Sequence, residues 1–232
     1  MALASIIETA ARRRTTIDYY GSSATDLTTQ FAGRNVTIDA QTLPPDGPAP
    51  FVVIRDGDDF LGAVSETDLQ TLLAPSISPP WRMDEAADEY RALYSLLDDT
   101  VFTSLDRRQL LAASREIEDR AYRVGQGHLS VGFQSHAAFD AQRAVYRRLA
   151  SDTPLDIHIY VVDETQTDDM PGITIHVEPT TEIGHYWFMA FDGGDDPSQQ
   201  CALVARQDGD TYEGVWTYDP RLVERVFAAV EN

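Results

Sequence analysis

The chain has 232 residues, enough to bury a hydrophobic core without disulfides or metal clips, and its net charge is −20 with a sequence pI near 4.4. All 18 basic residues are arginines, and such an acidic, lysine-free composition is typical of proteins from the cytoplasm of halophilic organisms, where salt screens the repulsion between carboxylates. This charge argues against direct binding of nucleic acids and of anionic membranes, because both depend on cationic side chains.

Cysteine content and hydropathy indicate a cytoplasmic protein. Cys201 is the only cysteine, which excludes an intrachain disulfide and a thiolate-cluster metal site. The N-terminus lacks the pattern of a signal peptide. The longest apolar runs, such as residues 186–191, are too short to span a bilayer.

The first third of the chain predicts a small α/β unit. Residues 3–13 have the spacing of an amphipathic helix, and strands are expected at 15–20 and 36–40 with a helix between them. A strand–helix–strand unit of this kind favours parallel strands. Residues 51–55 and 60–64 flank a turn rich in aspartate and glycine, which predicts an antiparallel hairpin. The aspartates of this turn are interpreted as solvated.

A short helix at 68–73 and a proline-rich connector at 75–83 follow. The connector predicts a division into an N-terminal α/β subdomain, residues 1–76, and a second domain, residues 84–232. The second domain is expected to begin with a helix at about 84–97.

The longest predicted helix occupies the stretch 102–125. Ser104 and Asp106 are candidate caps for its N-terminus, and Gly125 and Gly127 offer a stop. A buried stripe is predicted at Leu110, Ala113, Ile117, Ala121 and Val124, with Arg107, Arg108, Glu116, Asp119, Arg120 and Arg123 mostly outside it.

Ser114 and Glu118 lie four residues apart in this helix, so they project from one side. In one interpretation Ser114 donates to a carbonyl one turn earlier, and Glu118 pairs with Arg115 or Tyr122. In the other, Ser114 and Glu118 form the polar wall of a pocket. The sequence leaves both open.

The strand–helix–strand pattern recurs after the long helix, with strands at 128–134 and 155–162 around a helix at 136–149. Four further strands and a final helix that begins at Asp219-Pro220 complete the chain. Short connections between these strands predict an antiparallel meander. The expected fold class is therefore α/β, with mixed parallel and antiparallel sheets and flanking helices. The four strands are expected at 173–178, 184–191, 200–206 and 212–218.

Residues for catalysis or metal binding are hard to find. Ser114 lies inside a helix rather than in a Gly-x-Ser-x-Gly turn, and the acidic run 192–196 is typical of a hydrated hairpin loop. No metal site is predicted, because no two histidines have chelating spacing on one element, although a zinc site built from separate strands is left open. The histidines are His128, His136, His158, His176 and His185.

The late strands are rich in aromatic residues of matching parity, so one sheet surface is expected to face the long helix. Polar groups at the rim of this surface would give an apolar cavity of the kind that binds a small molecule. The candidate ligand-binding residues are Ser114, Glu118, Tyr122, Gln134, Trp187 and Trp216.

Four short segments, in this order and spacing, resemble the DICT sensory domain family. They are residues 108–118, 132–134, 146–149 and 214–220. The resemblance covers roughly residues 86–229, and the chain looks like the stand-alone form found in halophilic archaea. The family implies signal sensing and relay without catalysis; it identifies no ligand and assigns no residue a role.

We therefore expect a cytoplasmic, non-enzymatic sensory protein that regulates a partner such as a kinase or a transcription regulator. The sequence leaves homo-oligomer formation open. No cofactor can be named. A constitutive scaffold without a ligand is the alternative interpretation, and an enzyme on an unfamiliar α/β platform is the third.

Overall fold

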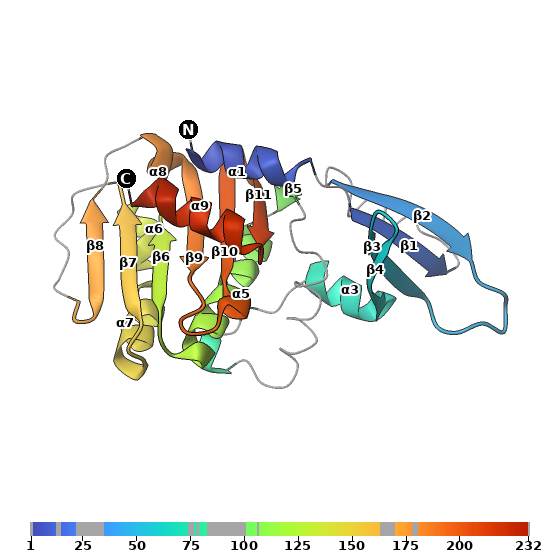
Figure 1. The fold of residues 1–232 in the computed structure, drawn as a ribbon, viewed down its shortest axis with the longest axis horizontal. Coiled ribbons are helices and arrows are strands. Elements are labelled where there is room, and N and C mark those ends of the chain that lie inside the picture. The colour runs from blue at the N-terminus through green and yellow to red at the C-terminus, as the bar shows by residue number, and fades with distance from the viewer. Residues whose placement is uncertain are drawn as a thin grey trace.

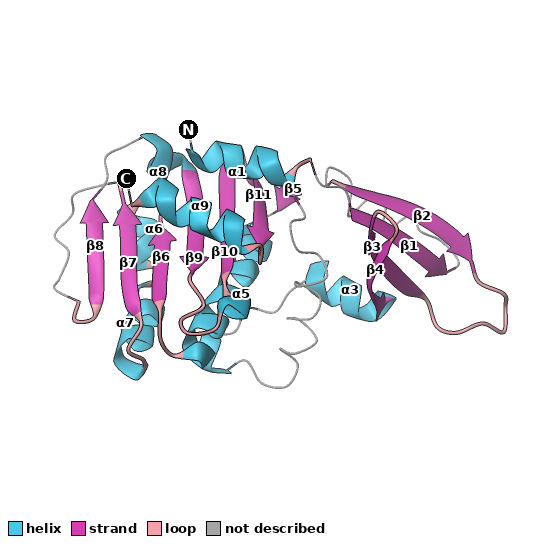
Figure 2. Cartoon of the chain, viewed as in Figure 1, coloured by secondary structure: helices cyan, strands magenta, loops and turns pink. Residues whose placement is uncertain are grey.

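A computed structural model describes residues 2–12, 15–21, 35–73, 77, 79–82, 101–105, 107–162, 170–177 and 181–231. In this part of the chain two mixed sheets carry helices on their faces, as the sequence predicted (Figures 1 and 2). The predicted helices between residues 21 and 35 and at 84–97 lie outside the described residues.

The smaller sheet has the strand order β2-β1-β3-β4. Strands β1 (Thr15–Gly21) and β2 (Val36–Thr42) are parallel, and β3 (Phe51–Asp56) and β4 (Asp59–Ser65) form the predicted antiparallel hairpin. Alternate residues of β1 are buried, since one face of this strand packs on the core. The hairpin leads directly into helix α3, Glu66–Leu73.

The larger sheet has the order β5-β11-β10-β9-β6-β7-β8. Strands β9, β10 and β11 form an antiparallel meander, and β6, β7 and β8 are parallel to one another. The strands are β5 (Val101–Leu105), β6 (His128–Gly132), β7 (Asp156–Val161), β8 (Ile173–Val177), β9 (Tyr186–Phe191), β10 (Cys201–Asp208) and β11 (Thr211–Thr217).

The prediction for the strand at 173–178 was wrong in one respect. This strand, β8, was expected in the antiparallel meander, but it pairs in parallel with β7 at the sheet edge. The connection of residues 162–172 is long enough to return the chain to the start of β7, which a parallel pair requires. The sequence interpretation had grouped the strand at 173–178 with the later strands, whose short connections predicted the meander.

Helices cover both faces of the larger sheet (Figure 1). On one face, α1 (Ala2–Ala10) and α9 (Pro220–Val230) pack together, and Arg225 Nη2 donates to Ser5 O at 3.3 Å. The predicted division at 75–83 remains a prediction, but α1 contributes to the core of the larger sheet.

The other face carries α5 (Arg107–Val124), α6 (His136–Asp140) and α7 (Arg143–Asp152). Shorter elements are α8 (Thr181–His185) and the 3-10 turns η1 (Pro80–Arg82) and η2 (Pro197–Gln199).

Two helix boundaries differ from the prediction. The stretch that begins at Phe102 is a strand up to Leu105 rather than helix, because its β-branched and aromatic residues pair with β11. The predicted helix at 136–149 is two helices, α6 and α7, with Gln142 at the break, where its side chain bonds to Arg115. The predicted cap Asp106 lies outside the described residues.

The acidic run after β9 forms the predicted hairpin loop. Asp192 Oδ1 accepts hydrogen bonds from the backbone N–H groups of His128 and Gly194, each at 2.9 Å. Gly127 faces this loop with φ of +106°, a value that favours glycine. The loop therefore fixes the start of β6.

Candidate functional site

Helix α5 is buried on more sides than the sequence predicted. Glu116, Asp119 and Arg120 were expected mostly outside the buried stripe, yet they are only 1%, 1% and 8% exposed. The reason is that α5 contacts the turn η1 as well as strands β9–β11, so it is covered on more than the sheet side. Such burial requires partners for the charges.

Charged residues of α5 meet this requirement by pairing one turn apart. Arg120 Nη2 lies 3.2 Å from Glu116 Oε1, and Arg123 Nε lies 2.9 Å from Asp119 Oδ2. The guanidinium of Arg120 also lies over the ring of Tyr218, 4.5 Å from its centroid. The charges are thus neutralised largely within the helix itself.

A second polar cluster connects α5 with α7. Arg115 donates to Glu118 Oε2 and to Gln142 Oε1, and Tyr146 OH donates to Glu118 Oε1 at 2.7 Å. The side chains of Arg115 and Glu118 are 8% and 1% exposed. We call these four residues, Arg115, Glu118, Gln142 and Tyr146, the α5–α7 network.

Burial dominates the protonation behaviour of this network. It raises the pKa of Glu118, against the attraction of Arg115 and the hydrogen bonds from Tyr146 and Arg115. It also raises the pKa of Tyr146 far above its usual value, and the charge of Glu118 adds to that rise. Burial alone would lower the pKa of Arg115, but the attraction of Glu118, that of Tyr146 and the hydrogen bond to Glu118 together outweigh it, and the net shift is upward. Arg115 therefore keeps its positive charge, whereas burial disfavours the charged form of Glu118.

The polar residues predicted on α5 are engaged within the fold. Ser114 Oγ donates to Leu110 O at 3.0 Å, the back-bond that one interpretation predicted. Glu118 pairs with Arg115, as that interpretation also allowed, and with Tyr146 rather than Tyr122. Tyr122 is half-buried and contacts the carboxylate of Asp152 on α7.

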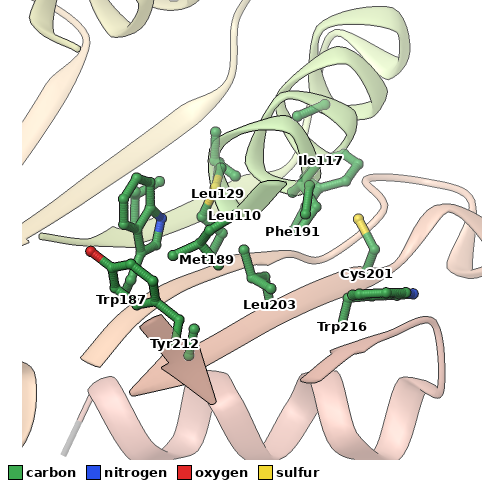
Figure 3. Close-up of a cluster of buried hydrophobic side chains, with 14 of the residues drawn as sticks. Leu110, Ile117, Leu129, Trp187, Met189, Phe191, Cys201, Leu203, Tyr212 and Trp216 are labelled. Carbon is green, nitrogen blue, oxygen red and sulfur yellow. The ribbon is translucent and has the colours of Figure 1, made fainter. Parts of the chain in front are cut away.

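The aromatic face forms as predicted. Side chains from β9, β10 and β11 point at the apolar side of α5 (Figure 3). Trp187 and Trp216 are 7% and 5% exposed within this cluster. The cluster includes Leu110 and Ile117 from α5 and, from the strands, Trp187, Met189, Phe191, Leu203, Tyr212 and Trp216.

Trp187 has an unusual position in the aromatic face. Its ring centroid lies 6.4 Å from that of Phe133 and 6.3 Å from that of Tyr212. Its buried Nε1–H has no hydrogen-bond partner among the described residues. Phe133 in turn contacts the Tyr146 ring edge-on at 5.7 Å, which places Trp187 one aromatic ring away from the α5–α7 network.

Gln134 is set apart from the other five candidates. It is half-buried just after β6, and its Nε2 donates to His185 O at 3.3 Å. Ser114, Glu118 and Tyr122 thus lie together on α5, Trp187 and Trp216 lie in the core cluster against which α5 packs, and Gln134 lies apart from both groups.

The outer side of α7 forms an open groove of about 620 Å³, in which arginines predominate. Arg143 pairs with Asp140, which also lines the groove, and Arg148 pairs with Asp152 and lies over the Trp81 ring, 4.3 Å from its centroid. The groove is lined by Asp140, Arg143, Ala144, Arg147, Arg148 and Ser151. On a chain of net charge −20, this is a basic surface.

Sequence reasoning missed Gln142 and Tyr146 as partners of Glu118. Both lie in a segment interpreted as an independent helix, more than twenty residues from Glu118 along the chain. The one available signal was a tyrosine at a core-facing helical position, since a buried phenol requires a hydrogen-bond partner.

Comparison with known proteins identifies one sequence family. The model described as "Sensory domain in DIguanylate Cyclases and Two-component system", abbreviated DICT, matches residues 90–208, just over half of the chain. No curated protein matches this chain. Among the described helices, none has the length and apolar character needed to cross a membrane.

Among solved structures, the crystal structure of polyphosphate kinase from Porphyromonas gingivalis is similar at 13% sequence identity and a TM-score of 0.40. The match covers 99% of this chain and 47% of that one, so the chain spans about half the length of that kinase.

Proposed function

Because the chain belongs to the DICT family of sensory domains, we propose that it is a non-enzymatic cytoplasmic sensor that regulates a partner protein through direct contacts. The observation that carries this proposal is the α5–α7 network, which lies inside the region matched by the family. A buried carboxylate is costly, and replacing such a group by apolar side chains is often neutral or stabilising. Its presence therefore points to a role other than stability.

The proposed stimulus is a small molecule that binds where Trp187, Phe133 and Tyr212 meet. These rings supply apolar surface, and Trp187 Nε1–H supplies a buried donor with no described partner. A ligand that accepts this hydrogen bond would remove the cost of leaving the donor unsatisfied. Ser114, Glu118, Tyr122 and Trp216 would then shape the surroundings rather than all contact the ligand.

A ring contact and a hydrogen bond connect this position with α7. Phe133 packs on Tyr146, and the Tyr146 hydroxyl donates to Glu118 on α5. Displacement of the Phe133 ring would therefore move Tyr146 and disturb this hydrogen bond between α7 and α5. Tyr146 and the groove residues occupy opposite sides of α7. A shift of α7 would therefore alter the basic groove.

The proposed partner surface is that groove, which fits an acidic segment of a regulatory protein such as a kinase or transcription regulator. Arg143 and Arg148 are already paired with Asp140 and Asp152, so Arg147 supplies the charge that would attract a carboxylate of the partner, on a chain whose net charge is −20. The contact would be specific in orientation even where salt screens long-range forces.

A pull-down from the cells that make the protein tests this output surface. Arg147→Glu reverses a charge in the groove, and Arg12→Glu makes the same change at an exposed position after α1. We expect the partner to be lost with Arg147→Glu and retained with Arg12→Glu. Equal retention by both variants would contradict the proposed surface.

A constitutive scaffold is the second candidate, because Ser114 and Glu118 are already satisfied within the fold. A scaffold would bind its partner equally with and without Trp187→Phe, a variant that removes the indole donor but keeps a large apolar ring. A sensor would show a changed partner affinity in this variant.

A further inference from the structure

Three parallel strands bring histidines together on the sheet face opposite to α5. The register pairs His128 of β6 with Asp156 of β7, and Tyr160 of β7 with His176 of β8. Residues two apart on a strand share a face, so His158 lies between these pairs. His128 also contacts the ring of Phe227 on α9, with centroids 5.3 Å apart, which identifies the α1–α9 face.

The ligand atoms in this cluster are close enough for one metal ion. One atom from each of His128, Asp156 and His158 lies within 4.8 Å of the others. At zinc–nitrogen distances of about 2.0–2.1 Å, tetrahedral ligands lie roughly 3.3–3.4 Å apart. His158 Nε2 and Asp156 Oδ1 are already 3.1 Å apart. A rotation of the His128 side chain that moves its ligand nitrogen by about an ångström would bring all three ligand atoms to these distances.

His176 supplies an outer partner of the kind that metal-bound histidines have. Its Nε2 lies 2.9 Å from His158 Nδ1, and its ring stacks on Tyr160 with centroids 4.5 Å apart. When His158 Nδ1–H donates to His176, the lone pair of His158 Nε2 is available for a metal. Ser130 is the corresponding outer partner of His128, because its Oγ lies 2.9 Å from His128 Nε2 and leaves Nδ1 for the metal.

The local charge favours a cation. Three carboxylates exert an electrostatic attraction on a positive charge at His128. They are Asp156 on β7, Asp192 in the loop after β9 and Glu231 at the end of α9.

We propose that His128, Asp156 and His158 bind one divalent first-row transition metal ion of the zinc class, with a fourth coordination position open to solvent. Two imidazoles and one carboxylate suit zinc, cobalt or nickel better than magnesium or calcium, which prefer oxygen ligands. Asp156 has a side chain that is 66% exposed, so the site is accessible from solvent. This proposal does not depend on the sensory function, because the cluster lies across the sheet from the α5–α7 network.

Isothermal titration of the tag-free protein with Zn²⁺, and with Mg²⁺ for comparison, tests the site. Asp156→Asn is the cleanest variant, because an exposed side chain is not needed for folding. We expect wild type to bind one Zn²⁺ and no Mg²⁺, and Asp156→Asn and His158→Ala to bind Zn²⁺ at least about tenfold more weakly. His176→Ala should weaken binding by about 10–100-fold, the usual effect of losing an outer partner.

His185→Ala is the matched control, since His185 is an exposed histidine at the end of α8. It should leave the Zn²⁺ affinity unchanged. The visible absorption of Co²⁺ bound in place of Zn²⁺ gives an independent reading of tetrahedral geometry. The proposal fails if wild type does not bind Zn²⁺, if Asp156→Asn binds it as tightly as wild type, or if His185→Ala loses as much affinity as His158→Ala. If wild type does not bind Zn²⁺, the histidines form only a hydrogen-bonded chain.

Discussion

Replacing Arg115 by methionine should destabilise the protein more at high pH than at low pH. The change leaves the Glu118 carboxylate, 1% exposed, without its cation. Removing one partner of a buried ion pair costs about 3–5 kcal/mol. The cost falls when the remaining group is neutralised, because protonated Glu118 no longer carries a buried charge.

The direction of the pH dependence follows from the pKa of Glu118. Burial raises this pKa above 4.5, and the attraction of Arg115 opposes the rise, so the variant has a still higher folded-state pKa. An acid with a raised folded-state pKa contributes stability that is present below the unfolded value and lost as the pH rises through the folded value. The slope is at most about 1.4 kcal/mol per pH unit, so between about pH 5 and about pH 8 the extra cost is at most about 4 kcal/mol.

Urea denaturation followed by tryptophan fluorescence measures the free energy of unfolding at both pH values. Urea is uncharged and leaves ion pairs unscreened, and the buried Trp187 and Trp216 report on the core. Arg147→Met, which removes an exposed guanidinium, should have little effect at either pH. The double variant with Arg115→Met and Glu118→Gln should lose the added pH dependence. Equal destabilisation at both pH values would refute this account of the buried pair.

Three further predictions concern the fold. Tyr146→Phe should lower the free energy of unfolding by about 1.5–3 kcal/mol in urea denaturation, because it removes a hydrogen bond to the buried Glu118 carboxylate. Gly127→Ala should cost about 1–3 kcal/mol more than Gly209→Ala by the same assay. Both glycines have positive φ, but a Cβ at Gly127 would lie 2.4 Å from Asp192 Oδ1, whereas nothing lies within 4 Å at Gly209. Raising KCl from about 0.1 to about 2 M should raise the thermal midpoint, since screening reduces self-repulsion at a net charge of −20, and an unchanged midpoint would contradict the electrostatic reasoning.

Local signals predicted most of the fold. The last helix begins at Pro220, with Asp219 accepting from the backbone N–H of Arg221, and its inward residues Leu222, Val226 and Val230 are buried as predicted. A cap, a proline in the first turn and a 3.6-residue period are all contained in one short segment. The aromatic face of the meander was predictable for the same reason, since strand parity alone decides it.

Features that depend on distant segments were not predictable. Glu116 and Asp119 have the spacing of a solvated helix face, and the contact of α5 with η1 that helps to bury them has no signature in the helix itself. Glu118 gave no indication that its partner would be Tyr146 on another helix.

The histidine cluster shows the same limit. Asp156 and His158 lie two residues apart on β7, but only the parallel register of β6 and β7 brings His128 beside them. Long-range strand pairing of this kind is set by the whole sheet rather than by the residues that it juxtaposes.

Native mass spectrometry of the protein purified from the cells that make it tests most directly whether the α5 core receives a ligand. We predict that wild type carries a bound small molecule in addition to its 25.8 kDa polypeptide, and that Trp187→Phe retains the fold but loses that molecule. A bare polypeptide in wild type, or a ligand retained unchanged by Trp187→Phe, would contradict the proposed sensing site.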